Sequence, residues 1–258
     1  MQLAIDYLIK TFHVKEIYTG VALGNETAKH LYASVGFVET GVVEDHMEEM
    51  RYMCQANIFV NTRSSIKLTG TKTIYFDPLE IEGEAHDADM VFITHEHYDH
   101  FSPEDIRKVI KVDTLLIVPQ VMLDMVMEKQ FPVAAVHGLL PAQTQEFDDV
   151  KCQAVPAYNI GKAFHPKDNC WIGYLVELDG KTYYAMGDTD ATAEAASVDA
   201  DVVFIPIGGK YTMDAAEAAE FINKNQPGLV VPIHYGDTAV CESFCQMLGS
   251  GQRVQRFW

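Results

Sequence analysis

The stretch Thr94-His95-Glu96-His97-Tyr98-Asp99-His100-Phe101 places three histidines and one aspartate within six residues. It follows the apolar run Met90-Val91-Phe92-Ile93, which is short and rich in β-branched and aromatic residues, so a buried strand is predicted there. Ser102-Pro103-Glu104-Asp105 then predicts the start of a helix, with Ser102 as the N-cap and Asp105 as its capping-box partner. The polar cluster is therefore expected on a turn between two rigid elements.

The spacing of these side chains favours a metal site over a chance grouping. Histidine accounts for only 10 of the 258 residues, so composition alone does not explain the pattern His-x-His-x-Asp-His. Imidazole and carboxylate groups are common ligands of zinc and of other transition metals. We expect the alternate residues His95 and His97 to converge on one ion, whereas Asp99 and His100, beyond the bend, suit a second ion nearby.

The charge balance of the whole chain argues against a nucleic-acid partner. With 37 acidic residues against 19 basic ones, the formal net charge is −18, whereas nucleic-acid binding usually needs a basic face. No run of about 18 apolar residues predicts a membrane span, the N-terminus lacks the features of a signal peptide, and the five cysteines form no zinc-ribbon or disulfide pattern. We expect a cytoplasmic protein whose partner is a small-molecule substrate, with no nucleic acid or membrane bound.

Residues 1–53 predict a small α/β unit of their own. The predicted elements are a first helix, a strand at Lys15–Val21, a helix capped by Asn25, and strands at 36–41 and 47–52. The pattern Asn25-x-x-Ala28-x-x-Leu31-Tyr32-x-x-x-Gly36-Phe37 resembles the late motif of the GNAT N-acetyltransferases. This resemblance implies an asparagine that contacts acetyl-CoA and a tyrosine that can protonate the leaving thiolate.

The phosphate-binding loop of the GNAT family would precede the first helix, and the sequence begins inside that helix. We therefore expect the N-terminal unit to be a catalytically silent GNAT-like C-terminal fragment. The exposed edges of its strands would be covered by the rest of the chain or by a second copy of it, so a homo-oligomer is one expectation.

A second, larger unit is predicted from residue 55 to residue 258. Its predicted strands are 57–60, 65–68, 73–76, 114–118, 150–156, 171–178, 181–186 and 229–233, and its helices are 120–129, 213–225 and 238–248. The segment Asp87–Ile93 recurs almost letter for letter as Asp199–Ile205, which predicts two similar half-domains whose active-site loops gather along one edge. We therefore predict an α/β (α+β) fold, a mixed-sheet sandwich with outer helices.

Further candidate site residues follow other predicted strands. Asp188 comes directly after one of them, where a carboxylate can bridge two ions, and His234 ends another as a further ligand. Asp77 is either a turn former or a carboxylate that holds a ligand histidine. On the loop after the second repeat, Lys210 and Tyr211 either hold an anionic group of the substrate or are solvated loop residues.

Three motifs together resemble the metallo-β-lactamase superfamily. They are His95-x-His97-x-Asp99-His100, Gly187-Asp188-Thr189 and Pro232-Ile233-His234-Tyr235-Gly236. The stretch Pro206-Ile207-Gly208-Gly209-x-Tyr211-Thr212-Met213 is similar to the UlaG-type metal-dependent hydrolases of that superfamily. The resemblance implies an αββα sandwich over residues 55–258 and a dinuclear metal site. The implied ligands are His95 and His97 for the first ion, Asp99, His100 and His234 for the second, and Asp188 as the bridge.

One position departs from the pattern of that superfamily. The third histidine of the first ion would stand in a segment such as Pro-Ala-Phe-His, but the chain reads Pro156-Ala157-Tyr158-Asn159. Either Asn159 or His165, six residues later, completes the site. We favour His165 because imidazole is the better ligand for zinc. His137 is predicted to lie in a loop outside the site.

Such a site predicts metal-assisted hydrolysis. Two cations would lower the pKa of a bridging water, supply a hydroxide and stabilise the charge on the attacked oxygen. We expect zinc, with manganese or iron as alternatives, and we expect Asp99 and Asp188 to be catalytic, Asp99 by orienting the water or passing its proton on. The predicted reaction is hydrolysis of an ester, lactone or phosphodiester bond of a small molecule. The alternatives are a non-catalytic module that binds metal and ligand, and a remnant acetyltransferase.

Overall fold

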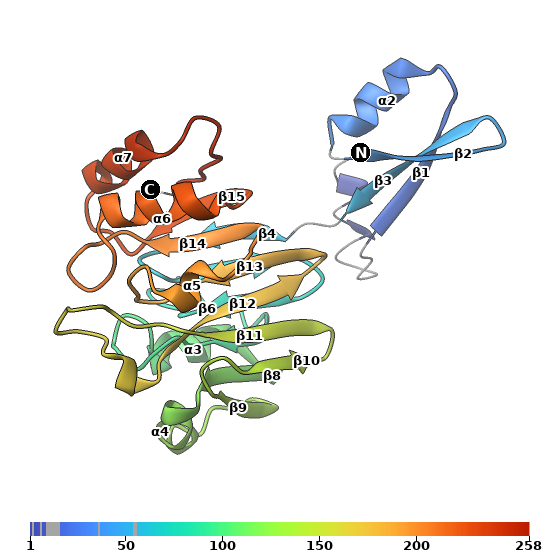
Figure 1. Cartoon of the computed structure of the whole chain (residues 1–258). Coiled ribbons are helices and arrows are strands. Elements are labelled where there is room, and N and C mark those ends of the chain that lie inside the picture. The colour runs from blue at the N-terminus through green and yellow to red at the C-terminus, as the bar shows by residue number, and fades with distance from the viewer. Residues whose placement is uncertain (2, 6, 9–15, 36, 54–55, 258) are drawn as a thin grey trace.

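The computed structural model describes the whole chain except residues 2, 6, 9–15, 36, 54–55 and 258 (Figure 1). The strands in this described part form three sheets, one of three strands and two of six. None of the helices found there is long and apolar enough to cross a membrane. The two large sheets carry the candidate site described below.

The three-stranded sheet belongs to the N-terminal unit. The elements of this unit are β1 (Glu16–Ala22), α2 (Glu26–Ala33), β2 (Val38–Glu44) and β3 (Met47–Met53). The strands are antiparallel in the order β1-β3-β2, and the Asn25 side chain caps α2 by accepting from the Ala28 N–H at 3.1 Å. The predicted strands and capped helix are thus present. Residues 3–5 and 7–8 are helical, and the rest of the predicted first helix, like Gly36, lies outside the described residues.

The two six-stranded sheets share one pattern of strand pairing. In the first, β4 to β6 are antiparallel neighbours and β6 to β9 run parallel. In the second, β10 to β13 are antiparallel neighbours and β13 to β15 run parallel. The strands are β4 (Asn57–Val60), β5 (Ile66–Thr69), β6 (Thr73–Phe76), β7 (Ala88–Phe92), β8 (Ile110–Pro119), β9 (Ala135–Leu139), β10 (Thr144–Phe147), β11 (Val150–Pro156), β12 (Ile172–Leu178), β13 (Lys181–Ala185), β14 (Val202–Pro206) and β15 (Leu229–Ile233).

Apolar side chains between the two large sheets form the main core, and helices cover the outer faces (Figure 1). Phe92 of the first sheet meets Tyr174 of the second, with ring centroids 5.0 Å apart. Helices α3 and α4 pack on the first sheet, and α5, α6 and α7 pack on the second. The helical elements are α3 (Pro103–Val109), η1 (Gln120–Met122), α4 (Leu123–Glu128), η2 (Lys167–Asn169), α5 (Ala193–Ala196), α6 (Ala215–Asn225) and α7 (Thr238–Met247). These four layers confirm the predicted αββα sandwich.

The repeated segments supply equivalent strands, β7 in the first sheet and β14 in the second. Each of them is the first strand that runs parallel to the one before it. The Tyr174 hydroxyl of the second sheet donates a 2.7 Å hydrogen bond to the Ile93 carbonyl at the end of β7. Because this bond is buried, it fixes the start of the His-rich loop relative to the second sheet.

Three local predictions are wrong. His137 lies in β9 rather than in a loop. The strand needs a glycine at the next position, Gly138, because a Cβ there would lie only 2.5 Å from the Gln120 side chain. Residues 120–129 form the 3-10 turn η1 followed by α4, rather than one helix. Asp105 does not complete a capping box, because its carboxylate accepts from the Ser102 hydroxyl at 2.8 Å and from the backbone N–H groups of Glu80 and Ile81 in the loop between β6 and β7.

Candidate metal centre

The His-rich loop between β7 and α3 is a tight turn that buries His95, Asp99 and His100 and exposes Glu96 and Tyr98. The His100 N–H donates to the His97 carbonyl at 2.9 Å and closes the turn. At its start, the Thr94 N–H donates to the Asp77 carboxylate at 2.7 Å. His95 and His100 are both fully buried. The loop therefore holds these side chains in fixed positions before α3 begins.

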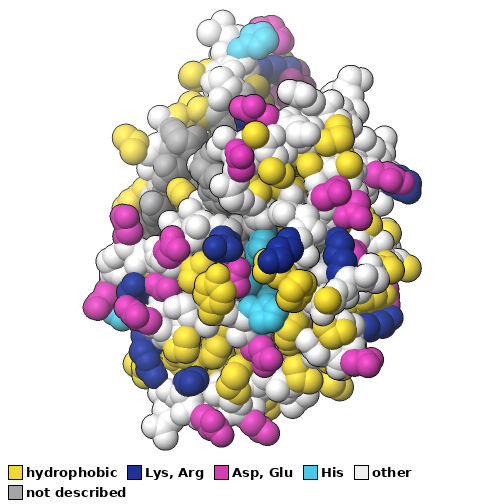
Figure 2. Space-filling view, turned by 90° about the vertical axis from the view of Figure 1, so that its left-hand side faces the viewer, with side chains coloured by type: hydrophobic (Ala, Val, Ile, Leu, Met, Phe, Trp, Pro, Cys, Tyr) yellow, Lys and Arg dark blue, Asp and Glu magenta, His cyan; other side chains and the backbone are white. Residues whose placement is uncertain are grey.

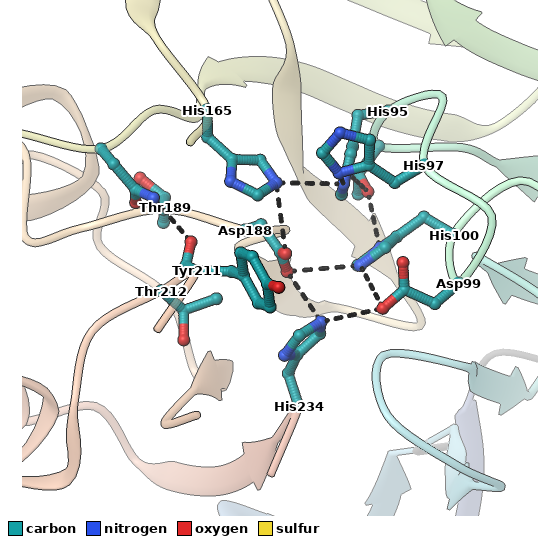
Figure 3. A network of polar contacts seen from close by, with 12 residues as sticks. His95, His97, Asp99, His100, His165, Asp188, Thr189, Tyr211, Thr212 and His234 are labelled. Carbon is teal, nitrogen blue, oxygen red and sulfur yellow. Dashed lines mark hydrogen bonds and ion pairs between the residues drawn. The ribbon is translucent and has the colours of Figure 1, made fainter. Parts of the chain in front are cut away.

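The seven side chains predicted as metal ligands lie in one cluster (Figure 3). They form three overlapping groups, and within each group one ligand atom per residue lies within 4.8 Å of the others. The groups are His95 with His97 and His165, His95 with His100 and Asp188, and Asp99 with His100 and His234. Four of the seven residues follow β7 in the first sheet, and the other three follow β11, β13 and β15 in the second. The cluster thus joins the two sheets.

Asp188 lies at the centre of this cluster. Its Oδ2 is 3.3 Å from Nε2 of His165, whereas its Oδ1 is 3.3 Å from Nε2 of His100 and 3.4 Å from Nε2 of His234. Gly187 before it has φ +67°, and a Cβ at that glycine would lie 3.2 Å from Thr94. The two carboxylate oxygens therefore face different histidines, which is an arrangement suited to bridging two ions.

His165 and Asn159 occupy different places in the site. Nε2 of His165 lies 3.4 Å from Nε2 of His95. The Asn159 amide nitrogen instead donates to the Tyr211 carbonyl at 2.6 Å, and its backbone N–H donates to the His165 carbonyl at 2.8 Å. The structure therefore brings His165 into the cluster, while Asn159 holds the loop that carries it.

The chemistry of the cluster fits a bound transition metal. Nε2 of His100, Nε2 of His234 and Oδ1 of Asp188 are buried and make no hydrogen bond to any described residue. Buried polar atoms without partners are rare because each one costs free energy. Five imidazoles and two carboxylates form the donor set that zinc, iron and manganese sites use. Metal ions held there would satisfy these atoms.

The charge states of these groups also favour coordination. Burial lowers the pKa of His165 to about 4 and that of His95 well below its usual range, so both rings are neutral near pH 7. Burial alone would raise the pKa of Asp188, but the neighbouring His100 and His234 outweigh it and hold that pKa below the usual value. His95 and His165 thus offer neutral rings with free lone pairs beside an ionised Asp188, which are the ligand states that a metal ion requires.

Asp77 holds His100 in place. Its Oδ2 accepts from Nδ1 of His100 at 2.7 Å and from the Thr94 hydroxyl at 2.6 Å. Burial opposes the charged form of His100, but Asp188 and Asp77 together raise its pKa well above the usual value. Asp77 was predicted to be either a turn former or a carboxylate that holds a ligand histidine. In the structure its carboxylate orients His100, so that Nε2 of His100 faces the cluster.

Two residues of the site carry no signal in the sequence pattern. The Trp171 ring packs on His95, His97 and His165, with centroids 4.9, 4.8 and 5.2 Å apart. Arg63, on the loop between β4 and β5, places Nη1 3.3 Å from Oδ2 of Asp99. A tryptophan at a strand start and a single arginine in a turn have ordinary structural uses, so neither could have been selected from sequence alone.

The cluster opens into a cavity of about 250 Å³ at the surface. The lining residues are Arg63, His97, Tyr98, Asp99, Phe164, His165, Asp188 and Tyr211. Lys210 lies beside this opening, with Nζ 4.8 Å from the ring centroid of Tyr211. Of the two predicted substrate contacts, Tyr211 thus lines the cavity itself and Lys210 lies at its margin.

Comparison with known proteins shows which proteins the chain is similar to. Residues 62–234, which include all seven candidate ligands, match the Beta-lactamase superfamily domain. Over 229 residues the chain is 30% identical to a UPF0173 metal-dependent hydrolase of Pyrococcus abyssi, an alignment that covers 81% of this chain and 95% of the relative. A crystal structure from Parabacteroides distasonis is 29% identical, with a TM-score of 0.67 over 79% of this chain and 93% of that one. Igni18, a metallo hydrolase of Ignicoccus hospitalis, is 22% identical, with a TM-score of 0.64 over 78% and 94% of the two chains.

Proposed function

Because the chain belongs to the metallo-β-lactamase superfamily, within its UPF0173 metal-dependent hydrolase family, we propose that it uses two metal ions to hydrolyse an ester, lactone or phosphodiester bond of a small molecule. Metal-dependent hydrolysis, without a stated substrate, is the activity for which the family is named. The observation that carries the dinuclear proposal is the position of Asp188, whose two oxygens face different histidines. Zinc suits the histidine-rich donor set best, with manganese or iron as alternatives.

The proposed division of ligands follows the three groups of side chains. His95, His97 and His165 would hold the first ion; Asp99, His100 and His234 would hold the second; and Asp188 would bridge them. Ions bound there would lower the pKa of a coordinated water and polarise the bond to be cleaved. His165 serves better than Asn159 because its Nε2 lies within the cluster, 3.4 Å from Nε2 of His95 and 3.3 Å from Oδ2 of Asp188, and because imidazole is the better ligand for zinc.

The protein's own side chains would orient the reactants around this centre. Oδ2 of Asp99 lies at the cavity, 3.4 Å from Nε2 of His234, where it can orient the attacking water and take up its proton. Tyr211 and Lys210, at the opening, would contact the substrate. Trp171 behind the rings excludes water from one side of the cluster.

Metal analysis together with turnover assays tests the proposal. We expect purified protein to bind close to two metal ions per chain and to hydrolyse generic ester, lactone or phosphodiester substrates, with activity lost to a chelator and restored by zinc. His97→Ala and Asp188→Ala should lose both bound metal and turnover. A metal-free variant with full activity would contradict the proposal, whereas metal binding without turnover on any substrate class would favour a non-catalytic binding module.

The N-terminal unit is proposed to have no acetyltransferase activity of its own. Its small core is limited to four buried apolar residues among those described, namely Ile5, Val21, Phe37 and Met50. We expect no binding of acetyl-CoA in a calorimetric titration of the full chain. Micromolar binding that Tyr32→Phe or Asn25→Ala weakens would instead support a working remnant.

A further inference from the structure

A second, larger cavity adjoins the metal centre. Its volume is about 500 Å³, and it shares Arg63 and Tyr211 with the cavity over the ligand cluster. Its lining includes Arg63, Glu80, Lys210, Tyr211 and His234. Figure 2 shows dark-blue Lys or Arg side chains beside the cyan histidines on this face of the molecule. A substrate cleaved at the metal centre therefore has room to extend past Arg63 and Tyr211.

Arg63 is held in an unusual backbone conformation. Its φ is +46°, in the left-handed region that costs free energy for a residue with a Cβ. The Arg63 carbonyl accepts from the His234 N–H at 3.0 Å, and the flanking Asn61 N–H donates to the Ser65 carbonyl at 2.9 Å. The turn is thus tied both to itself and to the loop that carries a candidate ligand, so the guanidinium starts from a fixed point above the cluster.

The ion pair with Asp99 does not account for this arrangement. One guanidinium nitrogen of Arg63 makes a single contact of 3.3 Å, and the Arg63 side chain is 44% exposed. Ion pairs of this exposed, single-contact kind contribute little to stability. A guanidinium carries five N–H donors, and Asp99 is the one acceptor recorded for it among the described residues, so the others are available in the cavity.

Lys210 supplies a second cation to the same cavity. Its Nζ lies 4.8 Å from the ring centroid of Tyr211 and 5.9 Å from that of Phe164. No carboxylate lies within ion-pair distance of it in the described part of the chain, although most other described lysines have one. Two aromatic rings therefore hold this ammonium group without neutralising its charge.

The charge of this cavity is opposite to that of the chain. Arg63 and Lys210 face one carboxylate, Glu80, among the described lining residues, whereas the protein as a whole has a formal charge of −18. The planar guanidinium of an arginine and the ammonium group of a lysine together bind carboxylates and phosphates. Building on the proposed hydrolysis, we propose that the substrate carries a carboxylate or phosphate on the part that is not cleaved, and that Arg63 and Lys210 bind it in this cavity.

The test compares two esters with the metal-loaded full chain. In para-nitrophenyl butyrate the acyl group ends in a methyl, and in para-nitrophenyl hemisuccinate it ends in a carboxylate. We expect the wild type to prefer the anionic ester in kcat/KM by about tenfold or more, and Arg63→Gln and Lys210→Met each to reduce that preference by roughly five- to tenfold. The ratio is the readout because a changed Arg63–Asp99 contact alters both rates together.

Matched controls separate charge recognition from a general effect. Lys224→Met removes an equal charge from α6, where the lysine pairs with Glu220, and should leave the ratio unchanged. Arg63→Lys should restore part of the preference. An unchanged ratio in both cavity variants, or no preference in the wild type, would overturn the proposal.

A binding measurement keeps the test independent of turnover. Succinate and β-glycerophosphate are titrated calorimetrically into the metal-loaded chain, and the tighter of the two identifies the anion class. Both cavity variants should weaken this binding relative to Lys224→Met, even if neither ester is cleaved. Absence of turnover on ester, lactone and phosphodiester substrates alike, together with charge-dependent binding, would thus refute the proposed function but support the subsite. Equal binding by all variants would refute the subsite.

Discussion

Asp77→Asn should lower both the metal affinity and the stability of the protein. The Asp77 carboxylate accepts three hydrogen bonds, from the Thr94 N–H at 2.7 Å, the Thr94 hydroxyl at 2.6 Å and Nδ1 of His100 at 2.7 Å. An asparagine keeps the first bond but turns an NH₂ group toward the other two. Nδ1 of His100 would then accept a hydrogen bond from that NH₂ group instead of donating one, so the proton of the neutral ring would lie on Nε2 and block the atom that faces the cluster.

The expected loss follows from these contacts. Removing the carboxylate that orients a ligand histidine typically lowers metal affinity by about 10- to 100-fold, which corresponds to about 1.4–2.7 kcal/mol. The lost charge-assisted bonds should also lower the free energy of unfolding of the metal-free protein by about 1.5–3 kcal/mol. Metal affinity is measured by competition with a chromogenic chelator, and stability by urea unfolding in the presence of chelator.

Asp179→Asn is the matched control. Asp179 has φ +53°, close to the +43° of Asp77, and its buried carboxylate accepts from both the N–H and the hydroxyl of Thr71. It lies at the β12–β13 turn and belongs to none of the candidate ligand groups. This variant should lose comparable stability and keep wild-type metal affinity. If Asp77→Asn bound metal within about twofold of the wild type, or if the control lost affinity equally, the orienting role would be refuted.

Three further predictions concern other parts of the site and fold. His165→Ala should lower affinity for one of two zinc ions by at least roughly tenfold, whereas Asn159→Ala should keep the zinc stoichiometry, as measured by competition titration. Glu194→Gln removes a carboxylate whose pKa is lowered to about 2, chiefly by Lys167; because this pair is exposed, the loss should be at most about 1 kcal/mol. This loss of unfolding free energy should be complete above the ordinary pKa of about 4.5 and should vanish as pH falls toward about 2. A loss of stability that grows in acid would contradict the prediction. Tyr174→Phe keeps the aromatic ring in the core but removes the hydrogen bond to the Ile93 carbonyl. This variant should lower the urea midpoint by an amount equivalent to about 1–2 kcal/mol without changing the m-value.

The sequence allowed the site to be predicted where local pattern determines position. Asp188 and His234 each follow an apolar strand, and the ends of parallel strands meet at one edge of their sheet, so distant residues could be expected to converge. The third ligand of the first ion was left open between His165 and Asn159, because the irregular segment that carries both residues has no periodicity. Asn159 differs from His165 through a contact with Tyr211, 52 residues away, that only packing creates.

Other features depend on the meeting of loops that sequence spacing does not encode. Arg63 reaches Asp99 across 36 residues and between two loops of the first sheet. His137 was missed as a strand residue because Gly138 ordinarily indicates a turn, whereas here the close approach of η1 excludes any larger side chain. Such contacts belong to the assembled sandwich and not to any one segment.

The ligand cluster draws residues from both six-stranded sheets, so bound ions would act as a cross-link between halves of the chain that fold from separate segments. Neither half could then unfold without releasing metal. The apparent stability of the sandwich would rise with free metal concentration, by about 2.7 kcal/mol at 100 times the dissociation constant. The melting temperature thereby becomes a measure of metal supply, and it can rank candidate metals for this protein before any substrate is identified.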